Sequence, residues 1–168
     1  MSIQNFYAAA QNMEFARDFQ FKVRSLGPFT EQDLLYLKTS NLPGKEITNK
    51  VVPYMGLEFN VPGSTKYTGS SAWEVKFWAD EAANIRNKME AWISEIFNDE
   101  TSAGKYGVST ELCSFDLLGK NLETLRRYQF VGLYPVKVGE LAYNITGSGE
   151  PLELSATFAY QYWRLIGL

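Results

Sequence analysis

Residues 152–163 read LELSATFAYQYW, a continuous alternation of apolar side chains with polar or small ones. Such alternation is typical of a β-strand with one buried face, because successive side chains of a strand point to opposite sides. One face would carry Leu152, Leu154, Ala156, Phe158, Tyr160 and Tyr162, and the other Glu153, Ser155, Thr157, Ala159, Gln161 and Trp163. The sequence therefore predicts one long, half-buried strand over 152–163.

The rest of the chain is also rich in short segments of this kind. Gly147-Ser148-Gly149 is a turn signal, and it predicts a hairpin between the strand 152–163 and another strand over 140–145. Further runs of β-branched and aromatic residues predict strands at 19–24, 34–38, 73–77, 111–118 and 124–133. A polar, glycine-bearing stretch over 98–108 predicts a loop, and a short helix is expected around 6–10.

One segment has a helical period instead. Apolar side chains recur three or four residues apart, which is the stripe of an amphipathic helix, at Ile85, Met89, Trp92, Ile93 and Ile96. Asp80 precedes this stripe, and aspartate is a favoured residue at a helix N-terminus. The sequence predicts an α-helix over about 80–97.

The segment 51–61 predicts a long apolar β-hairpin with its turn near Met55-Gly56, or else one long bent strand. Its apolar members are Val51, Val52, Tyr54, Met55, Leu57, Phe59 and Val61. Pro53 and Pro62 stand at the ends of the runs, and proline within a sheet belongs on an edge or at a bulge. An apolar hairpin with exposed edges aggregates unless it is covered. Two arrangements remain open: the hairpin packs on the core of its own chain, or it contacts a partner in an assembly.

Together these elements predict a mainly β fold in a single domain, residues 1–168. The expected architecture is two packed antiparallel sheets, as a sandwich or partly open barrel, with one flanking helix. At 168 residues a chain can bury roughly two-thirds of its unfolded surface, so it needs no disulfides or metals for stability.

The composition excludes several kinds of chemistry. The chain has no histidine and one cysteine, Cys113, which excludes histidine general bases, Ser-His and Cys-His pairs, and zinc sites built from His or Cys clusters. The acids Asp80, Glu81 and Glu90 are explained by helix capping and a solvated helix face. The pair Arg126-Arg127 has a basic character, but the net charge of −3 favours a structural or interface role over nucleic-acid binding. We expect no enzyme activity, cofactor or metal.

The segment 1–10 lacks the pattern of a signal peptide, and no run of about 18 apolar residues predicts a membrane span.

Several segments, in order along 15–163, resemble the tail tube protein of T-even-like contractile-tailed bacteriophages. The segments are Phe15-Ala16-Arg17, Phe21-Lys22-Val23, Leu42-Pro43-Gly44, Tyr54-Met55, Phe59-Asn60-Val61 with Gly63, Trp73-Glu74-Val75, Asp80-Glu81-Ala82 with Arg86 and Trp92, Gly132-Leu133-Tyr134-Pro135, Val138-Gly139-Glu140-Leu141, Phe158, Tyr160 and Tyr162-Trp163. The strongest part is 132–163, whereas 98–120 matches poorly.

The resemblance implies a structural subunit that forms hexameric rings, which stack into a hollow tube for phage DNA and the tape-measure protein. It also implies contacts with the tail sheath and a baseplate initiator. The protein would belong to the virion tail, assemble in the cytoplasm of the bacterial host, and not be embedded in a membrane. An alternative is the inner tube of a tailocin, an extracellular injection system or a type VI secretion apparatus.

Two sets of residues are candidates for function in such a tube. The subunit interface would use Val51, Tyr54, Met55, Leu57, Phe59 and Val61, and the lumen would be lined by Glu153, Ser155, Thr157 and Gln161. These four residues are equally compatible with an outer face.

Two other classes of protein remain as rivals, a monomeric β-barrel with a ligand pocket and an enzyme that uses a carboxylate pair.

Overall fold

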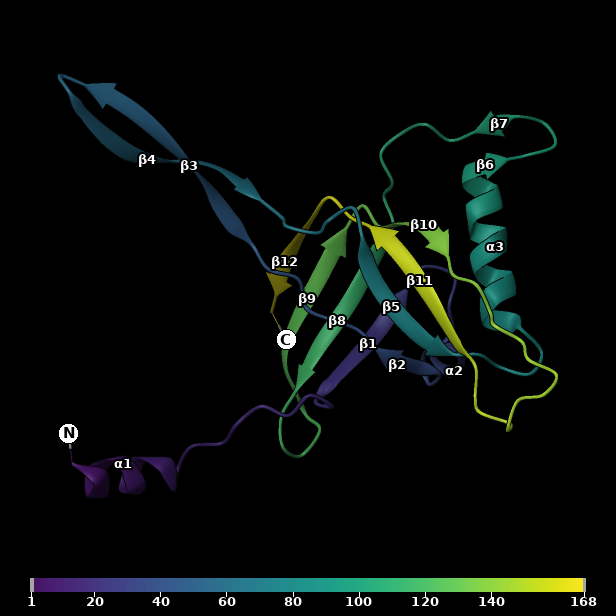
Figure 1. The fold of residues 1–168 in the computed structure, drawn as a ribbon, viewed down its shortest axis with the longest axis horizontal. Helices are drawn as coiled ribbons and strands as arrows, with labels where there is room; N and C mark the ends of the chain where they lie inside the picture. The colour runs from purple at the N-terminus through teal and green to yellow at the C-terminus, as the bar shows by residue number, and fades with distance from the viewer. Residues whose placement is uncertain (1, 168) are drawn as a thin grey trace.

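The computed structural model describes residues 2–167, which form a β-sandwich with one flanking helix and two projecting segments (Figure 1). One four-stranded antiparallel sheet has the order β1 (Phe21–Leu26), β8 (Leu112–Leu118), β9 (Thr124–Val131), β12 (Tyr162–Ile166). The other has the order β10 (Tyr134–Val138), β11 (Glu153–Ala159), β5 (Trp73–Trp78), β2 (Leu37–Thr39). We call these the β8–β9 sheet and the β5–β11 sheet. The expected mainly β fold with two packed antiparallel sheets is confirmed.

The smaller elements lie around this sandwich. The helices are α1 (Ile3–Ala10), α2 (Glu31–Leu34) and α3 (Asn84–Ile96), and the paired strands outside the two sheets are β3 (Glu46–Tyr54) with β4 (Leu57–Lys66), and β6 (Phe97–Asn98) with β7 (Ala103–Gly104). Helix α1 lies where a short helix is expected. The segment expected as a loop at 98–108 contains part of the small β6–β7 hairpin.

The core lies between the two sheets and is dominated by aromatic side chains. Trp73 of β5 stacks on Phe130 of β9 with ring centroids 4.7 Å apart, which ties one sheet to the other. Phe158 of β11 contacts both Trp73 and Trp92 of α3. Each such ring removes about 150–250 Å² from water. The packing of these rings therefore joins both sheets and the helix into one core.

Helix α3 begins later than predicted, at Asn84 rather than near Asp80. Ala83, the residue before it, has a left-handed backbone (φ +54°), so residues 80–83 form a turn. The carboxylate of Asp80 still accepts hydrogen bonds from the backbone N–H groups of Asn84 (2.9 Å) and Ile85 (3.3 Å). Asp80 thus caps the helix as expected, but from outside it.

The predicted strand 152–163 is in fact two strands in different sheets. β11 ends at Ala159, and β12 begins at Tyr162. Between them Tyr160 N–H donates to Ser70 O (2.8 Å), and Gln161 N–H donates to Val131 O (2.9 Å). The alternation of faces changes at this crossing, since Tyr160 is buried and Tyr162 is 42% exposed. The single-strand prediction is therefore wrong at its C-terminal end.

Other boundaries also differ from the predictions. The segment 140–145 is not a strand: it lies in the connection between β10 and β11, which contains Gly147-Ser148-Gly149. β11 pairs with β10 instead, Val138 opposite Ala156. The predicted strand 124–133 is divided at Gly132, whose φ of +73° ends β9 before β10 begins. The predicted strand 34–38 is shifted, because α2 extends to Leu34 and β2 begins at Leu37.

Candidate assembly surfaces

The predicted hairpin is present, and it projects far from the sandwich (Figure 1). It is longer than expected, since β3 and β4 pair from Glu46 opposite Lys66 to Tyr54 opposite Leu57. Met55 and Gly56 form the two-residue turn with φ of +48° and +82°, the signs that a type I′ turn requires. An isolated two-stranded hairpin is only marginally stable in water, so this element needs a surface to pack on.

One face of the hairpin is apolar. The cross-strand pairs Tyr54 with Leu57, Val52 with Phe59, and Lys50 with Val61 lie on the same side, because directly opposed residues of an antiparallel pair share a face. Tyr54 is 65% exposed, Leu57 64% and Phe59 50%, although aromatic and branched side chains are usually the most buried. We call Val52, Tyr54, Leu57, Phe59 and Val61 the hairpin's apolar face.

Not all of the predicted interface residues belong to this face. Val51 lies on the opposite side, opposed by Asn60. That side is more polar, because Asn49 Nδ2 donates to Asn60 Oδ1 at 2.7 Å. Met55 is at the tip and is 86% exposed. Val52 is not among the predicted interface residues, although its two-residue spacing from Tyr54 places it on the same face.

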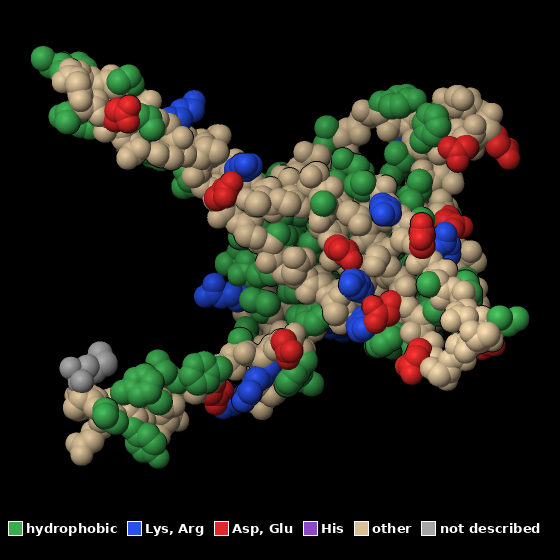
Figure 2. All heavy atoms as spheres, viewed as in Figure 1, with side chains coloured by type: hydrophobic (Ala, Val, Ile, Leu, Met, Phe, Trp, Pro, Cys, Tyr) green, Lys and Arg blue, Asp and Glu red, His purple; other side chains and the backbone are tan. Residues whose placement is uncertain are grey.

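The hairpin does not pack on the core of its own chain. Among residues 2–167, neither the buried core nor the apolar side chains packed against it include any residue of 46–66. Figure 2 shows hydrophobic side chains along the projecting hairpin, outside the body of the molecule. Of the two arrangements left open by the sequence, packing on the chain's own core is therefore wrong.

The structure brings three of the four lumen candidates together. Glu153, Ser155 and Thr157 alternate with the buried residues of β11, so they share the outer face of the β5–β11 sheet. Across the sheet they are opposite Trp78, Lys76 and Glu74. Gln161 is not on this face, because it lies in the crossing between β11 and β12.

Charges on this outer face occur as pairs. Glu153 forms an ion pair with Lys38 of β2, and Lys76 lies 3.9 Å from Glu74 (Nζ to Oε1). The hydrogen bond from Lys38 lowers the pKa of the Glu153 carboxyl. The face is therefore polar, with positive and negative charges interspersed.

Metal binding is one kind of chemistry that acidic and cysteine side chains of residues 2–167 could support. These residues hold no group of three or more acidic or cysteine side chains that could bind a metal ion. Cys113 is fully buried, and burial raises the pKa of its thiol, which keeps the sulfur protonated. Arg127 donates to the buried carboxylate of Asp116 from Nε (2.7 Å) and Nη2 (3.1 Å). This contact gives Arg127 a structural role, as expected from the sequence.

Among the helices of residues 2–167, none has the length and apolar character that a membrane crossing requires.

These features define a class of protein, namely a structural subunit of a larger assembly, with an apolar hairpin and with sheet edges available for contact. The family model of the phage tail tube protein matches residues 4–166, so the chain belongs to the phage tail tube protein family. It is a structural subunit of a phage tail tube, and the resemblance seen in its sequence is confirmed.

Individual proteins agree with this assignment. The tail tube protein gp19 of Enterobacteria phage T4 is 27% identical over 169 residues, covering 97% of this chain and 99% of that protein. Two solved structures share the fold. A chain in the tube terminating cap of the anti-feeding prophage has a TM-score of 0.65 at 14% identity, with 93% of each chain covered. A chain in the extended sheath–tube complex of an extracellular contractile injection system has a TM-score of 0.55 at 12% identity, covering 100% of this chain and 99% of that one.

Proposed function

We propose that this tail tube subunit forms hexameric rings, which stack into a hollow conduit, and that the hairpin's apolar face joins neighbouring subunits. The observation that carries the proposal is the exposure of Tyr54, Leu57 and Phe59 on a hairpin that has no contact with its own core. Burial of apolar surface stabilises by about 25 cal/mol per Å², so covering this face in an assembly is strongly favourable.

The sheets also suit closure into a ring. In residues 2–167 each four-stranded sheet ends in two edge strands, β1 and β12 in one and β10 and β2 in the other. Edge strands carry unpaired backbone groups, and closing a barrel across subunits removes them. If one sheet from each of six copies joins the barrel, 24 strands at about 4.8 Å spacing and about 40° tilt give a backbone diameter near 50 Å.

Such a barrel is wide enough for its cargo. After side chains are subtracted, the lumen would be roughly 35–40 Å across, compared with about 20 Å for duplex DNA.

The charge of the ring also suits a conduit, which must not hold DNA tightly. A ring of six copies carries 6 × −3 = −18 formal charges. We infer that the paired charges around Glu153, with Ser155 and Thr157, line this lumen. In this role the subunit performs no catalysis and needs no cofactor.

Further partners follow from the same role. We infer that the outside of the tube contacts a contractile sheath, which the likeness to a chain of a sheath–tube complex supports at the level of the fold. The tape-measure protein would occupy the lumen with the DNA, and a baseplate initiator would nucleate the first ring. Assembly would take place in the cytoplasm of the bacterial host, and the tube would not be embedded in a membrane.

A second candidate is the inner tube of another contractile injection machine, such as a tailocin. It is favoured by the shared fold with a chain of an extracellular contractile injection system. The match to the phage tail tube family and to phage relatives favours DNA transport instead.

Electron microscopy of the purified protein at increasing concentration, with and without its baseplate complex as a nucleus, tests the proposal. Hollow tubes with six-fold rings and a lumen of roughly 35–40 Å are expected. Monomers under every one of these conditions would overturn the proposal, and so would a ring whose lumen is too narrow for duplex DNA.

A further inference from the structure

The N-terminal arm, residues 2–20, is a second projecting segment (Figure 1). Its helix α1 places Ile3, Phe6, Tyr7 and Ala10 on one face, because residues three and four apart are neighbours on a helix. Phe6 is 63% exposed and Tyr7 65%, and no residue of α1 is buried. The arm from Ser2 to Met13 contains no charged residue. It is therefore an uncharged amphipathic helix whose apolar face is uncovered.

The arm is attached to the body only near its C-terminal end. Glu14 Oε1 accepts a hydrogen bond from Lys120 Nζ at 2.7 Å, in the turn between β8 and β9. Among residues 2–167, every hydrogen bond made by residues 2–13 stays within the arm. The Glu14–Lys120 contact thus fixes the base of the arm, while α1 extends away from the sandwich, where Figure 2 shows its hydrophobic side chains exposed.

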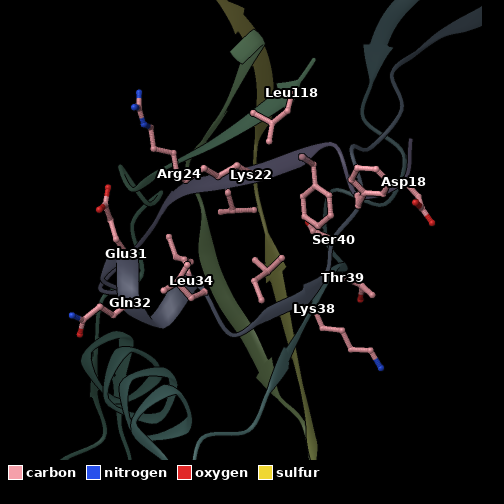
Figure 3. Close-up of a pocket in the computed structure, with 15 residues that line it drawn as sticks. Asp18, Lys22, Arg24, Glu31, Gln32, Leu34, Lys38, Thr39, Ser40 and Leu118 are labelled. Carbon is pink, nitrogen blue, oxygen red and sulfur yellow. The ribbon is translucent and has the colours of Figure 1, made fainter. Parts of the chain in front are cut away.

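A matching groove lies between β1 and β2, beside the base of the arm (Figure 3). It has a volume of about 830 Å³. The apolar part of its lining comes from Phe19, Phe21, Val23, Leu34, Leu37 and Leu118. Five charged residues also line the groove, Asp18, Lys22, Arg24, Glu31 and Lys38, and the charged ends of Arg24, Glu31 and Lys38 point away from it. The groove stays open because β1 and β2 are the edge strands of their respective sheets.

One polar group in the groove also lacks a partner. Ser40 lines the groove, and its hydroxyl oxygen is buried without a hydrogen-bond partner among residues 2–167. A buried hydroxyl without a partner is costly, and a carbonyl or amide of an inserted segment would satisfy it. The arm contributes such groups through Gln4 and Asn5.

We propose that α1 of one copy docks in the groove between β1 and β2 of a second copy in the assembled tube, which rests on the proposed function. Residues 2–13 of the arm carry no charged side chain, so they can lie on the apolar part of the lining without burying a charge of their own. The aromatic rings of Phe6, Tyr7 and Phe15 are 63–76% exposed and carry about 150–250 Å² each. With Ile3 and Met13 they reach several hundred Å², against the roughly 800 Å² per partner of a standard interface. In the proposed assembly the hairpin's apolar face would add to this area.

Disulfide trapping tests this contact, since the buried Cys113 gives a silent background. We would mix Ala10→Cys protein, changed on the apolar face of α1, with Leu35→Cys protein, changed on the groove rim, and then assemble and oxidise them. Ala8→Cys, on the opposite face of α1, is the matched control, and each variant oxidised alone corrects for like pairs. We expect dimers from the Ala10 and Leu35 variants at several times the yield of the Ala8 control.

Other outcomes overturn the inference. Equal yields from the two α1 variants would show that α1 has no fixed orientation in the groove. Trapping of Met55→Cys with Leu35→Cys instead would make the hairpin tip the occupant. An internal disulfide in dilute monomers of the double variant Ala10→Cys/Leu35→Cys would place the arm in its own groove. If the wild-type protein forms tubes but the Ala10→Cys and Leu35→Cys proteins give no crosslink, this inference alone is refuted. If the wild-type protein forms no tubes, the proposed function is refuted as well.

A second variant pair measures what the contact contributes to assembly. Phe6→Ser with Tyr7→Ser removes the aromatic rings, and Ala8→Ser with Asn12→Ser changes the opposite side of the arm. We expect the first pair to raise the concentration needed for assembly at least tenfold, without lowering the melting temperature of the monomer. Equal assembly thresholds for the two pairs would overturn the inference.

Discussion

Gly27, in the loop after β1, packs directly against the Trp92 ring of helix α3. Its φ is +50°, and a Cβ placed on it would lie 2.4 Å from the Trp92 ring. Gly27→Ala therefore combines backbone strain with a clash in the core, and we expect it to lower the free energy of unfolding by about 2–4 kcal/mol.

Gly149→Ala is the matched control for Gly27→Ala. Its φ is +88°, but open space surrounds the added Cβ, so it should cost only the strain of about 1 kcal/mol. Urea denaturation of both variants separates strain from clash. Equal losses would contradict the close packing of Trp92 on Gly27.

Asp33 connects α2 to α3. Its carboxylate accepts a hydrogen bond from the Thr30 backbone (2.8 Å) and forms an ion pair with Lys88. Burial acts to raise the pKa of Asp33, but the hydrogen bonds from Lys88 and Thr30 outweigh it and lower the pKa below its ordinary 3.8. A lowered pKa in the folded state stabilises the protein above pH 3.8, and this contribution is lost as the pH falls through the folded-state pKa.

We expect Asp33→Asn to reduce the free energy of unfolding at pH 7 by about 1 kcal/mol. The difference from the wild type should shrink at a pH well below 3.8, where the wild-type carboxyl is also becoming protonated. Urea titrations of both proteins, at pH 7 and at the lower pH, measure this difference in the free energy of unfolding. Glu31→Gln, in the same helix but outside the cap, should show neither effect, and a difference that grows on acidification would refute the assigned role.

At the scale of elements, the hairpin gives the sharpest test. Phe59→Asp or Tyr54→Asp places a charge on the apolar face, and charges are costly to bury in an interface. We expect either variant to remain a folded monomer and to form no tubes at concentrations where the wild type does, as measured by electron microscopy and circular dichroism.

Asn60→Asp is the control for the hairpin prediction, because it adds the same charge on the other side of the same strand and retains the oxygen that accepts from Asn49. It should assemble close to normally. Intact tubes from Phe59→Asp would remove the apolar face from the interface.

The same elements show what the sequence could predict. The hairpin turn at Met55-Gly56 and the apolar stripe of α3 are local patterns, and the sequence alone predicts both. The division of 152–163 was not predictable, because the alternation continues through Gln161 while backbone partners distant in sequence, Ser70 and Val131, decide where the chain changes sheets. The segment 140–145 has strand-forming composition, but it does not pair with a sheet edge.

At the scale of the whole molecule, the two projecting segments were harder to predict than the sandwich. Composition indicates that 51–61 is apolar, but whether it folds onto its own core depends on the direction in which β3 leaves the sandwich. For the arm, the sequence predicts only a short helix around residues 6–10. The groove between β1 and β2 could not be predicted, because it is formed by residues that are distant in the sequence, such as Phe21 and Leu118. The apolar residues of 51–61 indicated self-association, and the family resemblance indicated a tube. The surfaces that form the contacts follow from tertiary geometry.

The charge pairs on the β5–β11 sheet allow a test of the lumen wall. Glu74→Gln with Glu153→Gln leaves Lys76 and Lys38 without their carboxylate partners. In a ring of six copies this change removes 6 × 2 = 12 negative charges from one face. Because DNA affinity rises with the number of phosphate contacts and falls steeply with salt, we expect assembled tubes of this variant to retain duplex DNA at least tenfold more tightly at low salt.

A control variant shows whether the position of the removed charges matters for DNA retention. Glu140→Gln with Glu150→Gln removes the same number of charges from the connection between β10 and β11, outside the β5–β11 sheet, and should leave DNA retention close to that of wild-type tubes. Nuclease treatment distinguishes DNA held inside the tube, which is protected, from DNA on the outside. If only the first variant holds DNA that is protected from nuclease and released by salt, Glu153 lies in the lumen. Only a wall that surrounds the DNA can both attract it through the freed lysines and shield it from nuclease. Equal retention by both would assign the lumen to another surface, and the outer face of the β8–β9 sheet would be the next candidate.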